Sequence, residues 1–211
     1  MTPAGFRQRL LARIAPHASL SDSEVDRLEA YYSLLCRWNR KINLTALPLD
    51  PLGEHALDRL FVEPLVAADY VPDVPIQWAD LGTGGGSPAV PLKVSRELAE
   101  LTMVESRSRK AAFLREVVRV LGLSNTRVLT HRFEAIRDGQ IAPQSVDLVT
   151  VRAVRLGSSF FQLAERILAP GGRLMLFGSE GTDSLPTPSR FRLEVEVALP
   201  GGDDSRLRIY G

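Results

Sequence analysis

A glycine-rich stretch from Asp80 to Pro88 is the part of the chain whose residue types point most directly to chemistry. It reads Asp-Leu-Gly-Thr-Gly-Gly-Gly-Ser-Pro and follows a short apolar run over residues 76–80. Glycine lets the backbone turn sharply and lets a ligand approach it closely. A loop that follows a parallel strand lies at the carboxyl edge of the sheet, where α/β proteins bind ligands. We therefore predict a cofactor site at this loop.

Two classes of cofactor use a loop of this kind. A dinucleotide fingerprint needs glycine or alanine at its third position, where counting from Gly82 and Gly84 reaches Ser87. Asp80 would repel a pyrophosphate, whereas its charge suits the ammonium and sulfonium groups of S-adenosylmethionine. Glu105 follows about 20 residues later, a spacing at which an acidic side chain binds ribose hydroxyls. The pattern favours S-adenosylmethionine, and the alternative is a tight turn beside a solvated strand end.

The elements that must position this loop indicate an α/β fold. Short apolar runs alternate with helical segments, which predicts strands at 76–80, 101–105, 127–130, 146–151 and 173–177, and helices at 90–100, 108–121, 133–138 and 158–168. Such alternation is typical of a mostly parallel sheet with helices on both faces. Residues 191–198 and 206–210 alternate apolar and polar side chains. We expect them to add an antiparallel pair at the sheet edge, for seven strands in total.

The first seventy residues are predicted to be helical. Ser21 and Glu24 fit a capping box, and apolar residues follow at helical spacing. A shorter helix is expected before this cap and another over about 54–68. We thus divide the chain into an N-terminal helical extension, 1–70, and an α/β domain, 71–211.

The composition excludes several classes of protein. Hydrophobic residues make up 45% and charged residues 24%, as in an average soluble chain and unlike a disordered or collagenous one. No apolar stretch approaches the roughly 20 residues that span a bilayer. The single cysteine, Cys36, excludes an internal disulfide and does not suit a structural zinc site. We expect a cytoplasmic protein with no membrane association and no metal.

Several separated motifs resemble one family closely: the bacterial small-subunit ribosomal RNA guanine-N7 methyltransferases, RsmG, also called glucose-inhibited division protein B. The resemblance rests on Trp38-Asn39-Arg40-Lys41-Ile42-Asn43-Leu44-Thr45-Ala46, His55–Asp58, the loop 80–91, Glu105-Ser106, Arg109-Lys110, Phe113-Leu114, Arg132-Phe133-Glu134 and Val151–Val154. It implies a class I S-adenosylmethionine-dependent methyltransferase, with a Rossmann-like, mostly parallel seven-stranded sheet. The implied reaction is methylation of N7 of a guanine in 16S ribosomal RNA, free or in the small-subunit particle, by a monomer.

The resemblance also assigns roles to residues. Within the motifs, the implied cofactor contacts are Asp80, Gly82, Gly84, Ser87, Glu105, Phe133, Glu134 and Arg152. Arg152 would lie near the target base and is the nearest candidate for a catalytic residue, with a structural ion pair as the alternative. The implied RNA contacts are Arg109, Lys110 and Arg132. They belong to a segment, 91–140, with ten basic and six acidic residues, which a solvated helix surface would explain equally well.

The implied reaction needs little acid–base chemistry. Guanine N7 has an in-plane lone pair and no proton to remove, so the main task is alignment of the reacting atoms. We therefore expect no general base among His17, His55 and His131. The chain departs from the family pattern at Ser87, where phenylalanine is usual, and at Arg59, where a small residue is usual. Two alternatives stay open: a class I methyltransferase for another RNA, a small molecule or a protein, and a non-catalytic RNA or ribosome-assembly module.

Overall fold

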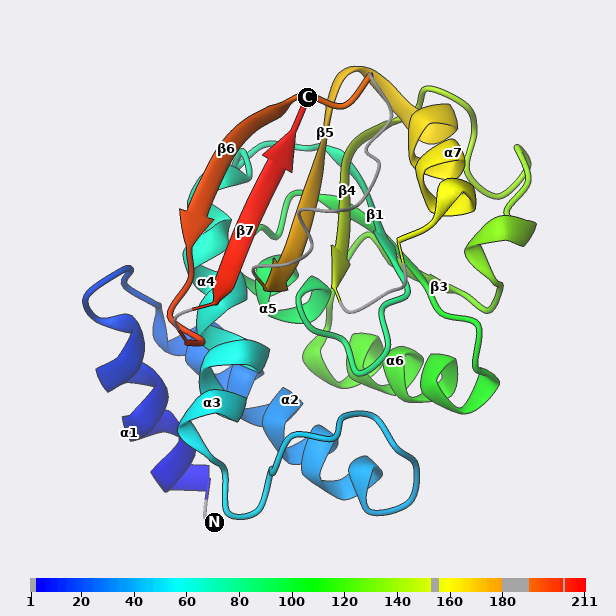
Figure 1. Ribbon diagram of the computed structural model, residues 1–211. Coiled ribbons are helices and arrows are strands. Elements are labelled where there is room, and N and C mark those ends of the chain that lie inside the picture. The colour runs from blue at the N-terminus through cyan, green and yellow to red at the C-terminus, as the bar shows by residue number, and fades with distance from the viewer. Residues whose placement is uncertain (1–2, 153–155, 180–189, 203) are drawn as a thin grey trace.

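A seven-stranded sheet forms the centre of the molecule (Figure 1). The computed structural model describes residues 3–152, 156–179, 190–202 and 204–211. Its strands are β1 (Gln77–Leu81), β2 (Glu100–Val104), β3 (Thr126–Leu129), β4 (Val146–Arg152), β5 (Leu168–Ser179), β6 (Leu193–Ala198) and β7 (Ser205–Tyr210), in the order β3-β2-β1-β4-β5-β7-β6. Strands β1 to β5 are parallel, and β7 runs antiparallel to both β5 and β6. The predicted α/β fold, with a mostly parallel seven-stranded sheet and an antiparallel edge pair, is confirmed.

The connections between the strands differ from the prediction in three places. The helices are α5 (Ala89–Ser95), α6 (Ser108–Leu121), the single 3₁₀ turn η3 (Phe133–Ala135) and α7 (Ser158–Ile167). The helix predicted over 90–100 ends at Ser95, and Arg96 leaves the helical conformation. In the turn before β2, buried Lys93 donates from Nζ to the carbonyls of Glu97 and Ala99, both at 2.6 Å. The helix predicted over 133–138 shrinks to η3. Strand β5 starts five residues early, with Gly171 at φ +78°.

The N-terminal region is helical, as predicted. It contains α1 (Pro3–Ile14), α2 (Asp22–Asn39), α3 (Glu54–Leu57), the π-helical turn η1 (Asp58–Val62), α4 (Glu63–Ala67) and the 3₁₀ turn η2 (Ala68–Tyr70). Both hydrogen bonds of the predicted capping box at Ser21 are present: the Glu24 amide donates to Ser21 Oγ, and the Ser21 amide donates to Glu24 Oε2. The segment expected as one helix over 54–68 is continuous but contains the wider turn η1.

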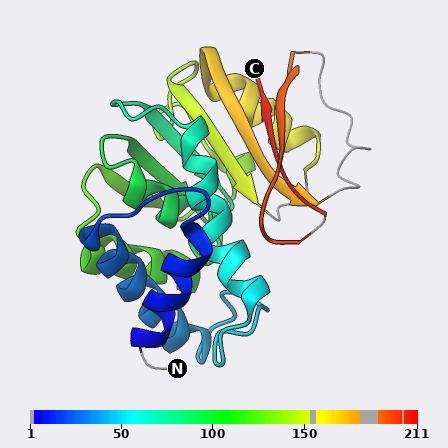
Figure 2. The same ribbon diagram turned by 90° about the vertical axis from the view of Figure 1, so that its left-hand side faces the viewer.

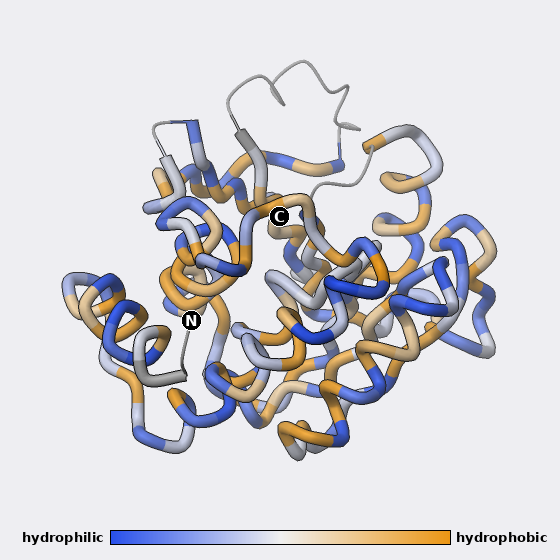
Figure 3. Tube along the Cα trace, turned by 90° about the horizontal axis from the view of Figure 1, so that it is seen from below, coloured by the Kyte–Doolittle hydropathy of each residue, from blue (hydrophilic) through white to orange (hydrophobic). Residues whose placement is uncertain are grey.

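Two hydrophobic clusters cover the two faces of the sheet. Side chains alternate along each strand, so Trp78 faces one cluster and Ala79 the other. The N-terminal helices, α5 and α6 pack on the Trp78 side, whereas α7 packs on the opposite side (Figure 2). Hydrophilic and hydrophobic residues alternate along the helices (Figure 3), as expected of elements that bury one stripe.

The N-terminal helices share their core with the sheet. Phe6 of α1 stacks on Tyr32 of α2 with ring centroids 4.6 Å apart, and Phe61 of η1 meets the Phe6 ring edge-on at 4.9 Å. These rings belong to the same cluster as Trp78 of β1. The predicted division of the chain at residue 70 stays a prediction. Among the described residues, no helix is long and apolar enough to cross a membrane.

Candidate functional site

A cavity of about 1010 Å³ opens at the carboxyl ends of the central strands. Loops after β1, β2 and β3 and the end of β4 form one part of its wall. The N-terminal region and the turn between β6 and β7 form another part. The residues from these two regions are Leu35, Leu44, Thr45, Ala46, Leu47, His55, Arg59, Leu60, Gly201, Gly202, Asp204 and Ser205. The cavity therefore lies between the glycine loop and the helical extension.

The glycine loop folds back over the end of β2. Gly82 adopts φ +77°, and its amide donates to Val104 O at 2.8 Å. Gly86 adopts φ +100°, and a Cβ atom there would lie 2.8 Å from Tyr31 Oη. Tyr31 in turn donates to the carbonyl of Gly85 at 2.6 Å. Tyr31 of helix α2 thus packs against the loop, and this contact leaves no room for a side chain at position 86.

Glu105 is fixed by backbone donors at the cavity wall. Its Oε2 accepts from the Gly84 amide at 2.8 Å, and its Oε1 accepts from the Arg107 amide at 2.7 Å. The side chain lines the cavity although the residue is only 6% exposed. Each carboxylate oxygen can accept a further hydrogen bond. Glu105 is therefore held in a position where hydroxyl donors of a ligand could reach it.

Asp80 lies behind the glycine loop and does not line the cavity. Its Oδ2 accepts from Thr150 Oγ1, which accepts from Trp78 Nε1 at 2.9 Å. Burial raises the pKa of Asp80 to about 6, against the opposing effect of hydrogen bonds from the hydroxyl groups of Thr150 and Thr83. The predicted contact between Asp80 and a cofactor stays a prediction.

The π-helical turn η1 leaves one carbonyl free beside the cavity. The Glu63 amide donates to Asp58 O, five residues back, instead of Arg59 O. Pro64, five residues after Arg59, has no N–H to donate. The Arg59 carbonyl instead accepts from Ser87 Oγ at 3.3 Å and from Arg152 Nη1. A wide turn in the helical extension thus binds the glycine loop and the end of β4, in keeping with the frequent occurrence of π turns at functional sites.

Arg152 forms an ion pair and also lines the cavity. Its side chain is 7% exposed, and its Nη2 lies 2.8 Å from Glu63 Oε2. The guanidinium also lies over the Phe177 ring, 4.7 Å from the centroid. Burial lowers the pKa of Arg152 to about 10, with Glu63 opposing the shift, so the group stays protonated at neutral pH. The structural ion pair considered as an alternative is present, and the side chain still faces the cavity.

The structure brings most of the predicted site residues to this one cavity. Those that line it are Gly82, Gly84, Ser87, Glu105, Lys110, Arg132, Phe133, Glu134 and Arg152. Arg109 is exposed and does not line the cavity. Lys110 donates from Nζ to Leu44 O at 3.4 Å, and burial lowers the pKa of its ammonium group. Their predicted roles in binding cofactor or RNA stay predictions.

Several residues in the cavity wall or directly behind it were not predicted to have a role. Asn39 Oδ1 accepts from the amides of Leu44 and Thr45 and so shapes the segment that lines the cavity beside the loop. His55 Nδ1 lies 3.0 Å from Gly201 O, which requires the proton on Nδ1 because a carbonyl only accepts. The motifs that carry the family resemblance include Asn39 and His55, but Glu63 and Ser205 lie outside them. From the sequence alone, Glu63 could not be predicted as a buried residue, because a glutamate four residues after Arg59 is typical of an ion pair on an exposed helix surface.

The arrangement suits a ligand with hydroxyl and cationic groups at the glycine loop. Near Arg59 and Arg152 it suits a group that accepts hydrogen bonds. Among the described residues, no group of three or more His, Cys, Asp or Glu side chains is placed to hold a metal ion.

Comparison with known proteins points to one family. Residues 24–185 match the family model described as rRNA small subunit methyltransferase G. The protein named ribosomal RNA small subunit methyltransferase G from Xanthomonas campestris pv. campestris strain 8004 is 35% identical over 182 residues, 83% of this chain and 81% of that protein. The protein of the same name from Stenotrophomonas maltophilia is 36% identical over 177 residues, 81% of this chain and 78% of that protein.

Solved structures share the fold. A SAM-dependent methyltransferase from Aquifex aeolicus aligns with a TM-score of 0.59 at 18% identity, over 75% of this chain and 93% of that one. TYW2 from P. horikoshii, in complex with MeSAdo, aligns with a TM-score of 0.56 at 13% identity, over 81% of this chain and 65% of that one. The predicted class I methyltransferase fold is confirmed by these likenesses.

Proposed function

The chain belongs to the rRNA small subunit methyltransferase G family, and on this premise we propose that it transfers a methyl group from S-adenosylmethionine to N7 of a guanine in 16S ribosomal RNA. The observation that carries the proposal is that one cavity is lined by the glycine loop and Glu105 and also by Arg59 and Arg152. A donor and an acceptor could meet inside it. The substrate would be the free RNA or the small-subunit particle, and the enzyme a cytoplasmic monomer.

The glycine loop fits S-adenosylmethionine better than a pyrophosphate. Loops that bind phosphates offer free backbone amides. Here the amides of Gly82 and Thr83 already donate to Val104 O, and the Gly84 amide donates to Glu105. The carboxylate of Asp80 lies directly behind the loop. Hydroxyl and ammonium donors would therefore find acceptors at this site, whereas phosphate oxygens would meet carboxylates.

The proposed roles follow the position of each residue. Glu105 would accept from the ribose hydroxyls, and the loop would hold the methionine part, with the charge of Asp80 behind it. The remaining proposed cofactor contacts are Gly82, Gly84, Ser87, Phe133, Glu134 and Arg152. Those proposed to bind RNA are Arg109, Lys110 and Arg132.

When bound, S-adenosylmethionine would supply a sulfonium methyl group. The N7 lone pair would form the new N–C bond, and the electron pair of the broken S–C bond would stay on sulfur. The positive charge would pass to the purine, and no proton would be released. The residues of this chain have to exclude water and align the two partners. A protonated Arg152 cannot remove a proton, and the reaction asks for none.

The decisive experiment is methyl transfer to defined acceptors. The purified protein is incubated with S-adenosylmethionine labelled in its methyl group and with 16S rRNA or small subunits that lack the modification. We expect label in the RNA and strand scission at one guanine after borohydride and aniline treatment, which detects N7-methylguanosine. Label only in proteins or small molecules would refute the ribosomal substrate. Failure to bind S-adenosylmethionine at millimolar concentration would favour the non-catalytic module.

A further inference from the structure

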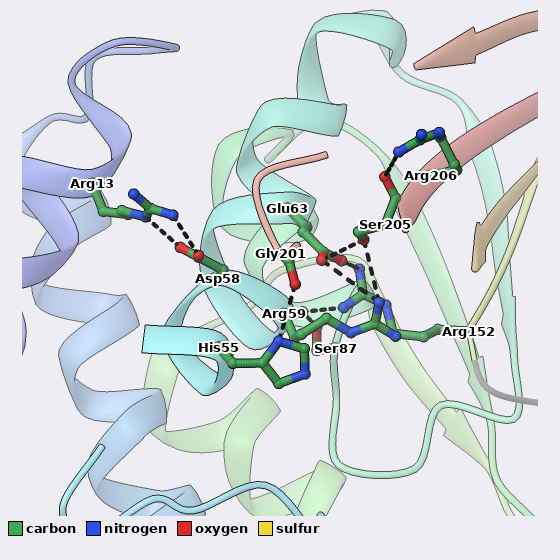
Figure 4. A network of polar contacts seen from close by, with 10 residues as sticks. All are labelled: Arg13, His55, Asp58, Arg59, Glu63, Ser87, Arg152, Gly201, Ser205 and Arg206. Atoms are coloured by element: carbon green, nitrogen blue, oxygen red, sulfur yellow. Dashed lines mark hydrogen bonds and ion pairs between the residues drawn. The ribbon is translucent and has the colours of Figure 1, made fainter. Parts of the chain in front are cut away.

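Beside Ser87, at the end of the glycine loop, the cavity has a wall rich in charged residues. We call Arg59, Glu63, Arg152 and Ser205 the arginine wall. Glu63 is fully buried at its centre. Its Oε1 accepts from Ser205 Oγ at 2.7 Å and lies 3.7 Å from Arg59 Nη1, and its Oε2 lies 2.8 Å from Arg152 Nη2. One carboxylate thus joins helix α4, strand β4 and strand β7 (Figure 4).

The turn between β6 and β7 is shaped to meet this wall. A Cβ atom at Gly201 would lie 1.8 Å from Glu63 Oε1, so a side chain here would displace the Glu63 carboxylate from its present position. Gly201 O also accepts from His55 Nδ1, and Arg59 Nη1 donates to Ser205 Oγ at 3.3 Å. The wall is therefore supported on both sides by polar contacts. Such support holds side chains in one geometry, as a binding site requires.

The arginine wall has a donor that the protein does not use. Among the described residues, two buried guanidinium nitrogens of Arg152, Nε and Nη2, have no hydrogen-bond partner, and Nη2 takes part in the ion pair with Glu63. A buried donor without a partner carries a desolvation penalty of about 1–3 kcal/mol. Arg152 lines the cavity, and its guanidinium lies next to that of Arg59 (Figure 4). With two arginines and one glutamate, the wall has a net charge of +1, which favours a ligand that presents an acceptor.

We propose that the arginine wall binds the O6 atom of the target guanine, with Arg152 as donor, Arg59 as the neighbouring cation and Glu63 as the positioning residue of both. This inference rests on the proposed function. Guanine carries two acceptors, O6 and N7, on one edge, whereas adenine has an amino donor in place of O6. Since N7 must keep its lone pair free for the methyl group, the arginine donor belongs on O6. Adenine at this wall would set an amino group against a guanidinium.

Nucleoside binding tests this assignment without any methyl transfer. The full chain, saturated with S-adenosylhomocysteine, is titrated with guanosine, inosine, adenosine and 2-aminopurine riboside. Guanosine and inosine both carry O6, whereas the other two lack it. We expect guanosine and inosine to bind within about threefold of each other and the other two about tenfold to a hundredfold more weakly. These probes contain no phosphate, so they separate base binding from binding of the RNA backbone.

Variants of the wall have a matched control in the same helical segment. Asp58 is also buried and also pairs with an arginine, Arg13, at 2.8 Å, but it faces α1 instead of the cavity (Figure 4). Arg152→Lys and Glu63→Gln are expected to reduce the preference for guanosine over adenosine at least fivefold, whereas Asp58→Asn keeps it. A thermal midpoint measured for each variant shows that it is folded.

Every outcome decides the proposal. Equal binding of all four nucleosides would overturn it, as would wild-type preference in both Arg152→Lys and Glu63→Gln. Binding of guanosine 5′-monophosphate and inorganic phosphate, but of no nucleoside at 10 mM, would assign the wall to the RNA backbone. Methyl transfer to RNA by a protein that does not discriminate nucleosides would refute the inference and leave the proposed function standing. Discrimination without methyl transfer to any RNA would refute the proposed function and reduce the inference to a base-binding site selective for O6.

Discussion

The amide of Gly84 donates a hydrogen bond of 2.8 Å to Oε2 of Glu105, which joins the glycine loop to the segment that follows β2. Oε1 of the same carboxylate accepts from the Arg107 amide. Because backbone donors hold both oxygens, the carboxylate is already oriented before a ligand arrives. Little side-chain freedom is lost on binding, and preorganisation of this kind increases affinity.

Replacement of Glu105 by glutamine is expected to weaken binding of S-adenosylmethionine about tenfold to a hundredfold. The amide group keeps the size of the side chain, but it loses the charge and turns an NH₂ group toward one of the two backbone donors. Loss of a charge-assisted hydrogen bond costs about 1.5–3 kcal/mol. Calorimetric titration measures the affinity, and Glu100→Gln, on the exposed first residue of β2, is the control. Equal affinity in wild type and Glu105→Gln would place the ribose elsewhere.

Glycine at position 86 is expected to be required for the fold of the loop. Gly86→Ala combines a positive φ of +100° with a Cβ contact of 2.8 Å to Tyr31 Oη. Gly122, which ends α6 at φ +61°, has nothing within 4 Å of a Cβ atom. Left-handed backbone alone costs about 1–2 kcal/mol. We expect Gly122→Ala to lose about this amount in urea unfolding, and Gly86→Ala to lose at least 1 kcal/mol more. Similar losses would show that Tyr31 moves aside freely.

The fold could be predicted from the sequence largely because its signals are local. The apolar runs indicate strands buried on both faces, and four consecutive residues, 21–24, are enough to predict the capping box at Ser21. The early end of α5 could not be predicted: the turn that follows it is held by a buried lysine, Lys93, which donates to the carbonyls of Glu97 and Ala99, and burial of a lysine is a property of the folded chain. The π turn at Asp58–Val62 is likewise a property of the packed helix, although Pro64 explains which carbonyl it frees.

The two sides of the cavity differed in how far the sequence could describe them. The glycine loop and Glu105 carry their chemistry in residue type and spacing, so their shared position was predicted. The arginine wall depends on contacts between residues far apart in the chain. Glu63 has a charged partner, Arg59, one turn away, and this pattern is typical of a solvent-exposed helix. The carboxylate is fully buried, and β7, far away in the sequence, brings Ser205 to it.

The ion pair between Arg13 and Asp58 predicts unequal effects of its two partners. Arg13 Nε and Nη2 each lie 2.8 Å from one oxygen of Asp58, and this attaches α1 to η1. The Arg13 side chain is 48% exposed and that of Asp58 only 5%. Arg13→Ala leaves a buried carboxylate without its partner, whereas Asp58→Asn releases an arginine that water can solvate. We expect losses in the free energy of unfolding of about 2–3 kcal/mol and about 1 kcal/mol respectively. A larger loss for Asp58→Asn would contradict this.

The buried carboxylate of Asp80 predicts a pH dependence of stability with a definite sign. Burial raises its pKa from an ordinary 3.8 to about 6 in the folded protein. Between these values the folded state holds a proton that the unfolded state has lost. Its contribution to stability is therefore fully present only below the unfolded pKa of 3.8 and is lost as the pH rises through 6. The size of the effect, at 1.36 kcal/mol for each pH unit, is about 3 kcal/mol.

Asp80→Asn removes this titration and keeps the shape of the side chain, so the difference between wild type and variant isolates it. Urea unfolding at constant ionic strength, at intervals from pH 4 to pH 7.5, gives the free energy of unfolding of both proteins. We expect the wild-type value minus the variant value to fall by about 2–3 kcal/mol across this range and to level off above pH 7. A difference that rises with pH would mean that the fold favours the ionised carboxylate. In that case Thr150, whose hydroxyl donates to Asp80, would outweigh burial, and a permanent negative charge would lie behind the glycine loop.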